Sequence, residues 1–228
     1  MLCVMLNAFL DLVLPQGCVG CDDPCGPLCP GCAAVWPARR TPDSPQRGLP
    51  ECWSAADYAG PLRRAILAYK ERARTALAAR LAEMLAFTAV TALGGRPPPG
   101  RVVLVPIPSA RRAVRARGHD PVARLAALAA HRMGAMGVCA VSRPMLALCR
   151  RTADQAGLSA TERAANLHTS LRATSRLRVA SEGPLVLVDD IVTTGATLAE
   201  ASRALHAVGA DPRLAVTLAA TRRRRPSC

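Results

Sequence analysis

Two adjacent carboxylates, Asp189 and Asp190, follow a run of four apolar residues, Leu185–Val188. Such a short apolar run is typical of a buried strand. A small hydroxyl-rich loop comes next, formed by Thr193, Thr194, Gly195, Ala196 and Thr197. An Ala-rich helical pattern begins there, so free backbone N–H groups and the helix dipole favour a bound phosphate, which Gly195 lets approach closely. Because the acids can accept hydroxyl groups beside that cradle, the segment favours a sugar phosphate as ligand.

This segment resembles the phosphoribosyl pyrophosphate (PRPP) motif of type I phosphoribosyltransferases, with four hydrophobic residues, two acids, two hydrophobic residues and a Thr-Thr-Gly-x-Thr loop. The resemblance implies that Asp189 and Asp190 hold the ribose hydroxyls and that residues 193–197 hold the 5′-phosphate of PRPP or ribose 5-phosphate, with Mg²⁺. The alternative is a magnesium site of a nucleotide hydrolase, which requires a GxxxxGK[ST] loop. Lys70 is the only lysine and no such glycine pattern precedes it.

A second group of charged residues follows the predicted strand Val102–Val105. The loop after Pro108 contains Ser109 and then an arginine series, Arg111, Arg112, Arg115 and Arg117. A guanidinium group can donate two parallel hydrogen bonds to the oxygens of one phosphate, and it stays charged. If the first segment binds PRPP, this loop suits the leaving pyrophosphate; the alternative is an ordinary basic loop.

Five of the ten cysteines lie close together near the N-terminus: Cys18, Cys21, Cys25, Cys29 and Cys32. Two CxxC pairs, Cys18–Cys21 and Cys29–Cys32, can present four thiolates to one structural zinc ion, and Cys25 is a possible substitute ligand. Disulfides, an iron–sulfur centre and a cluster without a ligand are the alternatives.

The element pattern predicts an α/β protein with a parallel sheet flanked by helices. The expected strands cover 53–58, 102–105, 146–149, 185–188 and 213–218, and the expected helices 61–69, 75–93, 121–133, 159–171 and 197–208. The predicted organisation is a short helix plus a four-cysteine zinc module in 1–36, a proline-rich linker in 37–50 and a main domain in 51–228. That domain divides into a helical part (51–100), a PRPP-binding core (101–221) and a basic tail (222–228).

The order of motifs is similar to that of the ComF family, which is linked to competence and DNA uptake. The CxxC pairs come first, then Val-Pro-Ile-Pro, Arg117-Gly118-His119-Asp120, a middle segment from Arg151 to Leu167, and the PRPP motif. The resemblance implies the type I phosphoribosyltransferase fold and places Arg117, Gln155, Arg163 and Asn166 at the rim of the site. The chain departs from the family at 117–121, where Arg-Gly-His-Asp-Pro replaces Arg-Gly-Phe-Asn-Gln.

The composition bounds the location and partners. The net charge of +14 suits phosphate ligands or nucleic acid. No convincing targeting segment or membrane span is present: Met1–Leu14 lacks a basic start, and the apolar stretch 73–95 carries charges. A cytoplasmic location is therefore expected.

Two functions lead the interpretation. One is a phosphoribosyltransferase of unknown acceptor. The other, implied by the resemblance, is a non-catalytic PRPP-binding factor acting with a DNA-uptake helicase or single-stranded DNA. A nucleic-acid-binding zinc protein with a relic phosphate site is a third possibility, which the intact acids and Thr-rich loop disfavour.

Overall fold

The computed structural model describes residues 17–42, 47–149, 170–174 and 183–221. A six-stranded sheet has the order β1-β2-β8-β7-β3-β4, and β5 and β6 form a separate pair. The strands of the large sheet are β1 (Ala38–Arg40), β2 (Glu51–Asp57), β3 (Val102–Pro106), β4 (Ala140–Ser142), β7 (Leu185–Val192) and β8 (Pro212–Ala220). All neighbours pair in parallel except β1 with β2. The structure thus confirms a mixed α/β architecture with a mostly parallel sheet flanked by helices.

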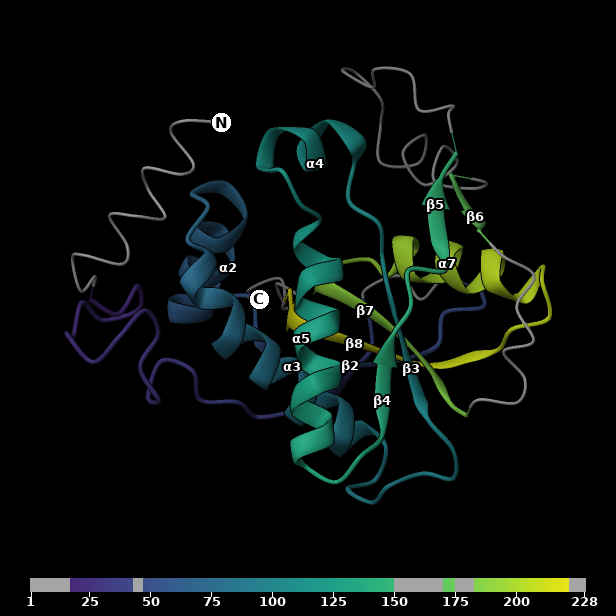
Figure 1. Cartoon of the computed structure of the whole chain (residues 1–228), viewed down its shortest axis with the longest axis horizontal. Coiled ribbons are helices and arrows are strands. Elements are labelled where there is room, and N and C mark those ends of the chain that lie inside the picture. The colour runs from purple at the N-terminus through teal and green to yellow at the C-terminus, as the bar shows by residue number, and fades with distance from the viewer. Residues whose placement is uncertain (1–16, 43–46, 150–169, 175–182, 222–228) are drawn as a thin grey trace, which may run out of the picture.

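Helices cover the sheet on both faces (Figure 1). They are α2 (Gly60–Glu71), α3 (Ala78–Ala92) with a preceding 3₁₀ turn at Thr75–Leu77, α4 (Arg111–Arg117), α5 (Pro121–Ala135) and α7 (Ala196–His206). One core joins α2, α3 and α5 to sheet residues such as Val186 and Val188. The other joins α7 to Leu185 and Leu187, which alternate with them along β7. This alternation explains why β7 reads as one continuous apolar run, since a strand buried on both faces needs apolar residues at every position.

The sheet has a switch point between β3 and β7. Strand β3 pairs with β4 on one side and with β7 on the other, and Pro106 lies opposite Val188. In open α/β sheets, ligands bind outside the carboxyl ends of the strands at such a point. The residues that leave this edge are Ile107–Ala110 after β3 and Asp189–Asp190 on β7, so the topology brings both candidate segments to one place.

Four local features differ from the sequence-based expectations. Residues 37–50 contain β1, whose backbone pairs with β2, rather than linker alone. The arginine series forms helix α4 instead of a loop, because Arg and Ala favour helix and Gly118 ends it with a left-handed φ of 77°. Strand β5 (Leu146–Leu148) pairs antiparallel with β6 (Leu171–Ala173) outside the parallel sheet. Strand β7 continues through the two acids to Val192, because Asp189, Ile191 and Val192 still pair with β8.

One helical stretch, Thr75–Ala92, is long and apolar enough by composition to cross a membrane, and half of it is buried within the protein. The charged residues within this stretch argue against a membrane span. Helix α3 packs on α5 and on strands β2 and β8, as expected of a core helix. The expected helix at 1–14, residues 159–169 of the expected helix 159–171 and the tail at 222–228 lie outside the described residues. At the end of that expected helix, Leu171 instead begins strand β6.

Candidate functional sites: a four-cysteine centre and an acidic cavity

The two CxxC pairs come together as the sequence predicts. One ligand atom from each of Cys18, Cys21, Cys29 and Cys32 lies within 4.8 Å of the others, which suits a single tetrahedral metal ion. Cys25 is not part of this group; its backbone N–H donates to Asp23 instead. A hydrogen bond to that same carboxylate is the largest of the effects that raise the pKa of the Cys25 thiol to about 12. Four soft sulfur donors can bind a metal such as zinc.

The backbone around the cysteines is arranged to stabilise thiolates. The N–H groups of Gly20 and Cys29 both donate to Sγ of Cys18 at 3.3 Å, and the N–H of Cys32 donates to Sγ of Cys29 at 3.3 Å. Burial opposes the charged form of Cys18, but these N–H donors outweigh it and lower the pKa of the thiol to about 6. Cys18 is therefore favoured as a thiolate, the form that coordinates metal, whereas burial and the neighbouring thiols raise the pKa of Cys32.

The cysteine segment packs directly on helix α2. Cys18 and Leu28 are buried in the same core as Ile66 and Leu81. Arg64 on α2 donates through Nε to the carbonyl oxygen of Val19 at 3.3 Å. The apolar residues of the predicted zinc module (1–36) thus belong to the same core as those of the predicted main domain.

At the carboxyl edge of β3 and β7 lies a cavity of about 280 Å³. Its polar lining comes from four elements and consists of Lys70, Ser109, Arg117, Asp189 and Asp190. Its apolar lining comes from the loop after β3 and from α4 and α5. Two acids, two cations and a hydroxyl in one small cavity can bind a ligand that carries both hydroxyl groups and negative charge.

Lys70 is the functional residue that the sequence interpretation missed. It lies in the last turn of α2, and its ammonium group forms an ion pair with Oδ2 of Asp190. The side chain of Asp190 is only 9 % exposed and that of Lys70 26 % exposed, so the pair is largely shielded from water. One feature of the sequence could have pointed to it: Lys70 is the only lysine among 30 Lys and Arg residues.

Asp189 is half-buried and its electrostatic environment is different. Burial raises the pKa of its carboxyl group well above the usual range, and the charge of neighbouring Asp190 raises it further. Its Oδ1 accepts a hydrogen bond from the backbone N–H of Asp190 at 2.8 Å. The two acids are therefore unequal: Asp190 has a cationic partner, whereas ionised Asp189 is destabilised by its surroundings.

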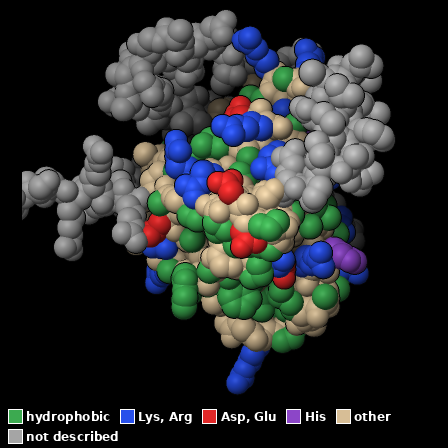
Figure 2. Space-filling view, turned by 90° about the vertical axis from the view of Figure 1, so that its left-hand side faces the viewer, with side chains coloured by type: hydrophobic (Ala, Val, Ile, Leu, Met, Phe, Trp, Pro, Cys, Tyr) green, Lys and Arg blue, Asp and Glu red, His purple; other side chains and the backbone are tan. Residues whose placement is uncertain are grey.

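Only one residue of the arginine series lines the cavity. Arg117 ends α4 there, and its Nη2 donates to Glu71 at 3.1 Å. Arg112 and Arg115 are exposed on α4, and Arg111 begins that helix. Basic side chains are scattered among apolar and neutral ones on one face of the molecule (Figure 2). Of the predicted pyrophosphate segment, the described side chains of Ser109 and Arg117 therefore line the cavity.

The loop after β3 is held by Asp120. The backbone N–H and Oγ of Ser109 donate to its two carboxylate oxygens at 2.8 and 2.9 Å. The same side chain accepts hydrogen bonds from the backbone N–H groups of Val122 and Ala123 and so caps α5. Pro121 fits the first helical position, where no N–H is needed. Both residues belong to the segment 117–121, where the sequence differs from the ComF pattern. Here Asp120 and Pro121 together form the start of a helix.

The threonine loop lies beside the acids but does not line the cavity. Thr193 and Thr194 are exposed, and Gly195, with φ of 75°, precedes the first residue of α7. A Cβ at Gly195 would lie 2.9 Å from Leu49 and 3.1 Å from Pro42. Both the positive φ and this close approach require glycine, and the neighbours that approach are side chains from before β2. Ala196 and Thr197 are half-buried in the first turn of α7. The other predicted rim residues, Gln155, Arg163 and Asn166, lie outside the described residues.

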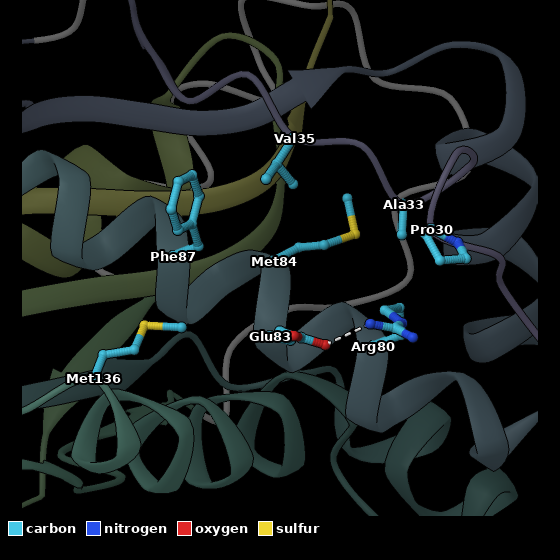
Figure 3. A pocket seen from close by; sticks show the side chains of 8 residues that line it. All are labelled: Pro30, Ala33, Val35, Arg80, Glu83, Met84, Phe87 and Met136. Carbon is cyan, nitrogen blue, oxygen red and sulfur yellow. Dashed lines mark hydrogen bonds and ion pairs between the residues drawn. The ribbon is translucent and has the colours of Figure 1, made fainter.

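A second cavity of about 250 Å³ is mainly apolar (Figure 3). Val35 from the segment after the cysteines and Met84 from α3 line it, together with Phe87 and Met136, which are 45 % and 40 % exposed. Its charged residues, Arg80 and Glu83, pair with each other at 2.9 Å. With its charges paired, this cavity lacks the groups that a phosphate ligand needs, so the acidic cavity is the candidate for chemistry.

The fold and these sites define an α/β protein with a polar cavity at the carboxyl edge of its sheet and a four-thiol metal site packed on the same core. The chain is 35% identical over 190 residues to the DNA utilization protein YhgH of Salmonella typhi, a match that covers 80% of this chain and 79% of that protein. Identity to the protein of the same name from Salmonella typhimurium is 34% over 190 residues, with the same coverage. The chain belongs to the family of these DNA utilization proteins. No protein-family model matches it.

Proposed function

We propose that the protein has the type I phosphoribosyltransferase fold and binds PRPP in the acidic cavity. The observation that carries the proposal is the position of Asp189 and Asp190, at the carboxyl end of β7, beside the switch point and just before the N-terminus of α7. Both acids line one cavity with Ser109 and Arg117 from the β3 side of the sheet.

In this proposal each part of the ligand has its own partner. The ribose 2′- and 3′-hydroxyls donate to Asp189 and Asp190, and the 5′-phosphate lies on the backbone of residues 193–197 at the start of α7. The diphosphate extends toward Arg117 and the loop at Ser109. Mg²⁺ held with the ligand beside Asp189 and Asp190 would offset charge on the leaving group.

The reaction would be displacement of pyrophosphate from the anomeric carbon by an acceptor. The transition state resembles an oxocarbenium ion, so carboxylates close to the sugar stabilise its positive charge. The arginine offsets the negative charge that develops on the departing pyrophosphate.

Calorimetry with PRPP and Mg²⁺ tests the ligand. We expect Asp189→Asn combined with Asp190→Asn to weaken binding by on the order of 1.5–3 kcal/mol for each charged hydrogen bond lost. Arg213→Gln, an exposed charge change on β8, serves as control. Equal affinities in wild type and double variant would remove the basis of the proposal.

A second proposed function is a role in DNA utilization without catalysis, in which PRPP binding accompanies contact with a helicase or single-stranded DNA in the cytoplasm. The name of the two relatives, DNA utilization protein, favours it, as does the net charge of +14. Pyrophosphate release from PRPP with a panel of bases and amines separates the two. Release of pyrophosphate in the presence of one acceptor supports the transferase. Binding of PRPP without pyrophosphate release in the presence of any acceptor supports the non-catalytic factor.

A further inference from the structure

Lys70 occupies an unusual place for the single lysine of a basic chain. Its helix, α2, shares a hydrophobic core with the cysteine segment and α3, yet its last turn supplies the ammonium group that pairs with Asp190 on β7. Lys70 also lines the acidic cavity beside both acids. A cation built into the protein thus already occupies one of the two carboxylates proposed to bind ribose.

The neighbours of Lys70 hold the backbone but leave the ammonium group to Asp190. Tyr69 donates from its hydroxyl to the carbonyl oxygen of Pro121 at 3.1 Å, and Glu71 pairs with Arg117 at 3.1 Å. These two contacts tie the end of α2 to α5 and α4. Because a lysine side chain is long and flexible, its head can change partners while the helix stays in place.

The ammonium group of Lys70 can leave Asp190 only if both charges find new partners. Moving Lys70 away leaves a shielded carboxylate without compensation, and the freed ammonium group needs an anion in turn. Ribose hydroxyls can replace it at Asp190, but only a ligand with a negative group at the anomeric carbon offers the lysine a new partner. Arg117 is a weaker candidate for this exchange because Glu71 already pairs with it.

We propose that Lys70 is a specificity-determining residue that exchanges Asp190 for the diphosphate of the ligand. The inference rests on the proposed PRPP site and adds a reason why that site would bind PRPP more tightly than ribose 5-phosphate. PRPP satisfies both halves of the broken ion pair, whereas ribose 5-phosphate satisfies only Asp190. Lys70 therefore makes the cavity favour phosphoribosyl ligands that carry an anionic leaving group.

The test compares two ligands on wild type and three variants by calorimetry at fixed Mg²⁺. We expect wild type to prefer PRPP over ribose 5-phosphate. Lys70→Gln should weaken PRPP by roughly ten- to a hundredfold, the loss expected for one charged hydrogen bond, and leave ribose 5-phosphate unchanged or tighter. Lys70→Arg should restore part of the preference. Arg72→Gln, an equal charge loss at the exposed next basic residue, should change neither affinity.

A second measurement follows the lysine itself in the unaltered protein. Because Lys70 is the only lysine, protein grown with ¹³C-labelled lysine gives the signals of one lysine side chain in NMR spectra. We expect its terminal CH₂ signal to shift on saturation with PRPP more than with ribose 5-phosphate. This readout stays available if a Lys70 variant does not fold.

The outcomes separate the two proposals. If wild type binds neither ligand, the PRPP site is wrong and the role of Lys70 falls with it. If wild type binds PRPP but Lys70→Gln affects both ligands equally or not at all, the site stands and the inference is overturned. A lysine signal that does not respond to saturating PRPP overturns it as well.

Discussion

Asp120 and Ser109 are joined by two hydrogen bonds, one from the backbone N–H and one from the hydroxyl of the serine, at 2.8 and 2.9 Å. The same carboxylate caps α5. One side chain thereby fixes both the loop that borders the acidic cavity and the helix that packs beneath it.

Replacement of Asp120 should distinguish its role as the N-cap of α5 from its role in holding the loop at Ser109. We expect Asp120→Ala to lower the free energy of unfolding by about 1–2 kcal/mol, as lost N-caps do, and also to weaken PRPP binding. Asp120→Asn should keep most of the stability, because Asn is an equally good cap. Urea unfolding and calorimetry give the two readouts. Equal stability of the alanine variant and wild type would contradict the capping role.

The two acids should have opposite effects on stability. The folded-state pKa of Asp189 is raised, so the folded protein retains its proton at a pH where the unfolded chain has lost it. Stability due to this group therefore falls as pH rises from the unfolded pKa of about 3.9 through the folded pKa, and stays lower above it. We expect Asp189→Asn to raise Tm at neutral pH, with a gain that shrinks as pH approaches 4.

The matching change, Asp190→Asn, should destabilise the protein, because it removes the partner of Lys70 in a shielded pair. A loss on the order of 1–3 kcal/mol is expected. Thermal unfolding of both variants from pH 4 to 8 checks the contrast. A lower Tm for Asp189→Asn at pH 7 would be incompatible with the burial argument.

The metal centre gives a prediction with an internal control. Purified protein should contain about one zinc ion per chain, and Cys29→Ser should lose most of it. Cys25→Ser should retain the metal in full, since this thiol lies outside the four-cysteine group. Elemental analysis by mass spectrometry measures both. Zinc loss from the Cys25 variant comparable to that from the Cys29 variant would require a different ligand set.

Two arginines of α4 should separate sugar phosphate from DNA. Arg117→Ala should weaken PRPP binding, because this residue lines the cavity, whereas Arg112→Ala should not, because it is exposed. For single-stranded DNA we expect weak, salt-sensitive binding in which the Arg112 variant lowers the salt slope by about 1. Fluorescence anisotropy over a salt series compares both ligands. Selective loss of DNA binding in the Arg117 variant would assign that residue to nucleic acid.

The sequence predicts the features that depend on local patterns. Apolar runs identify β3 and β7, helical patterns identify α2, α3 and α5, and CxxC spacing identifies the four cysteines, because each signal is complete within a few residues. The sequence could not predict the pairing of Lys70 with Asp190, since that contact depends on how α2 packs against the sheet.

Short elements were equally hidden. Strands β1, β4 and β6 contain three residues each, too few for an alternating pattern to stand out. The sequence predicts a loop where helix α4 forms, because its arginines suggest ligand contact, although Arg and Ala also favour helix. The helix propensity of these residues, rather than their suitability for binding phosphate, decides where their side chains point.

Helix α2 connects the two candidate sites physically. Near its start Arg64 contacts the backbone of the cysteine segment, and at its end Lys70 contacts Asp190. Its 12 residues span about 18 Å, so the metal centre and the cavity share one rigid element. A disturbance of the cysteine segment that displaces α2, such as oxidation of its thiols, would therefore also displace the ammonium group of Lys70 from Asp190.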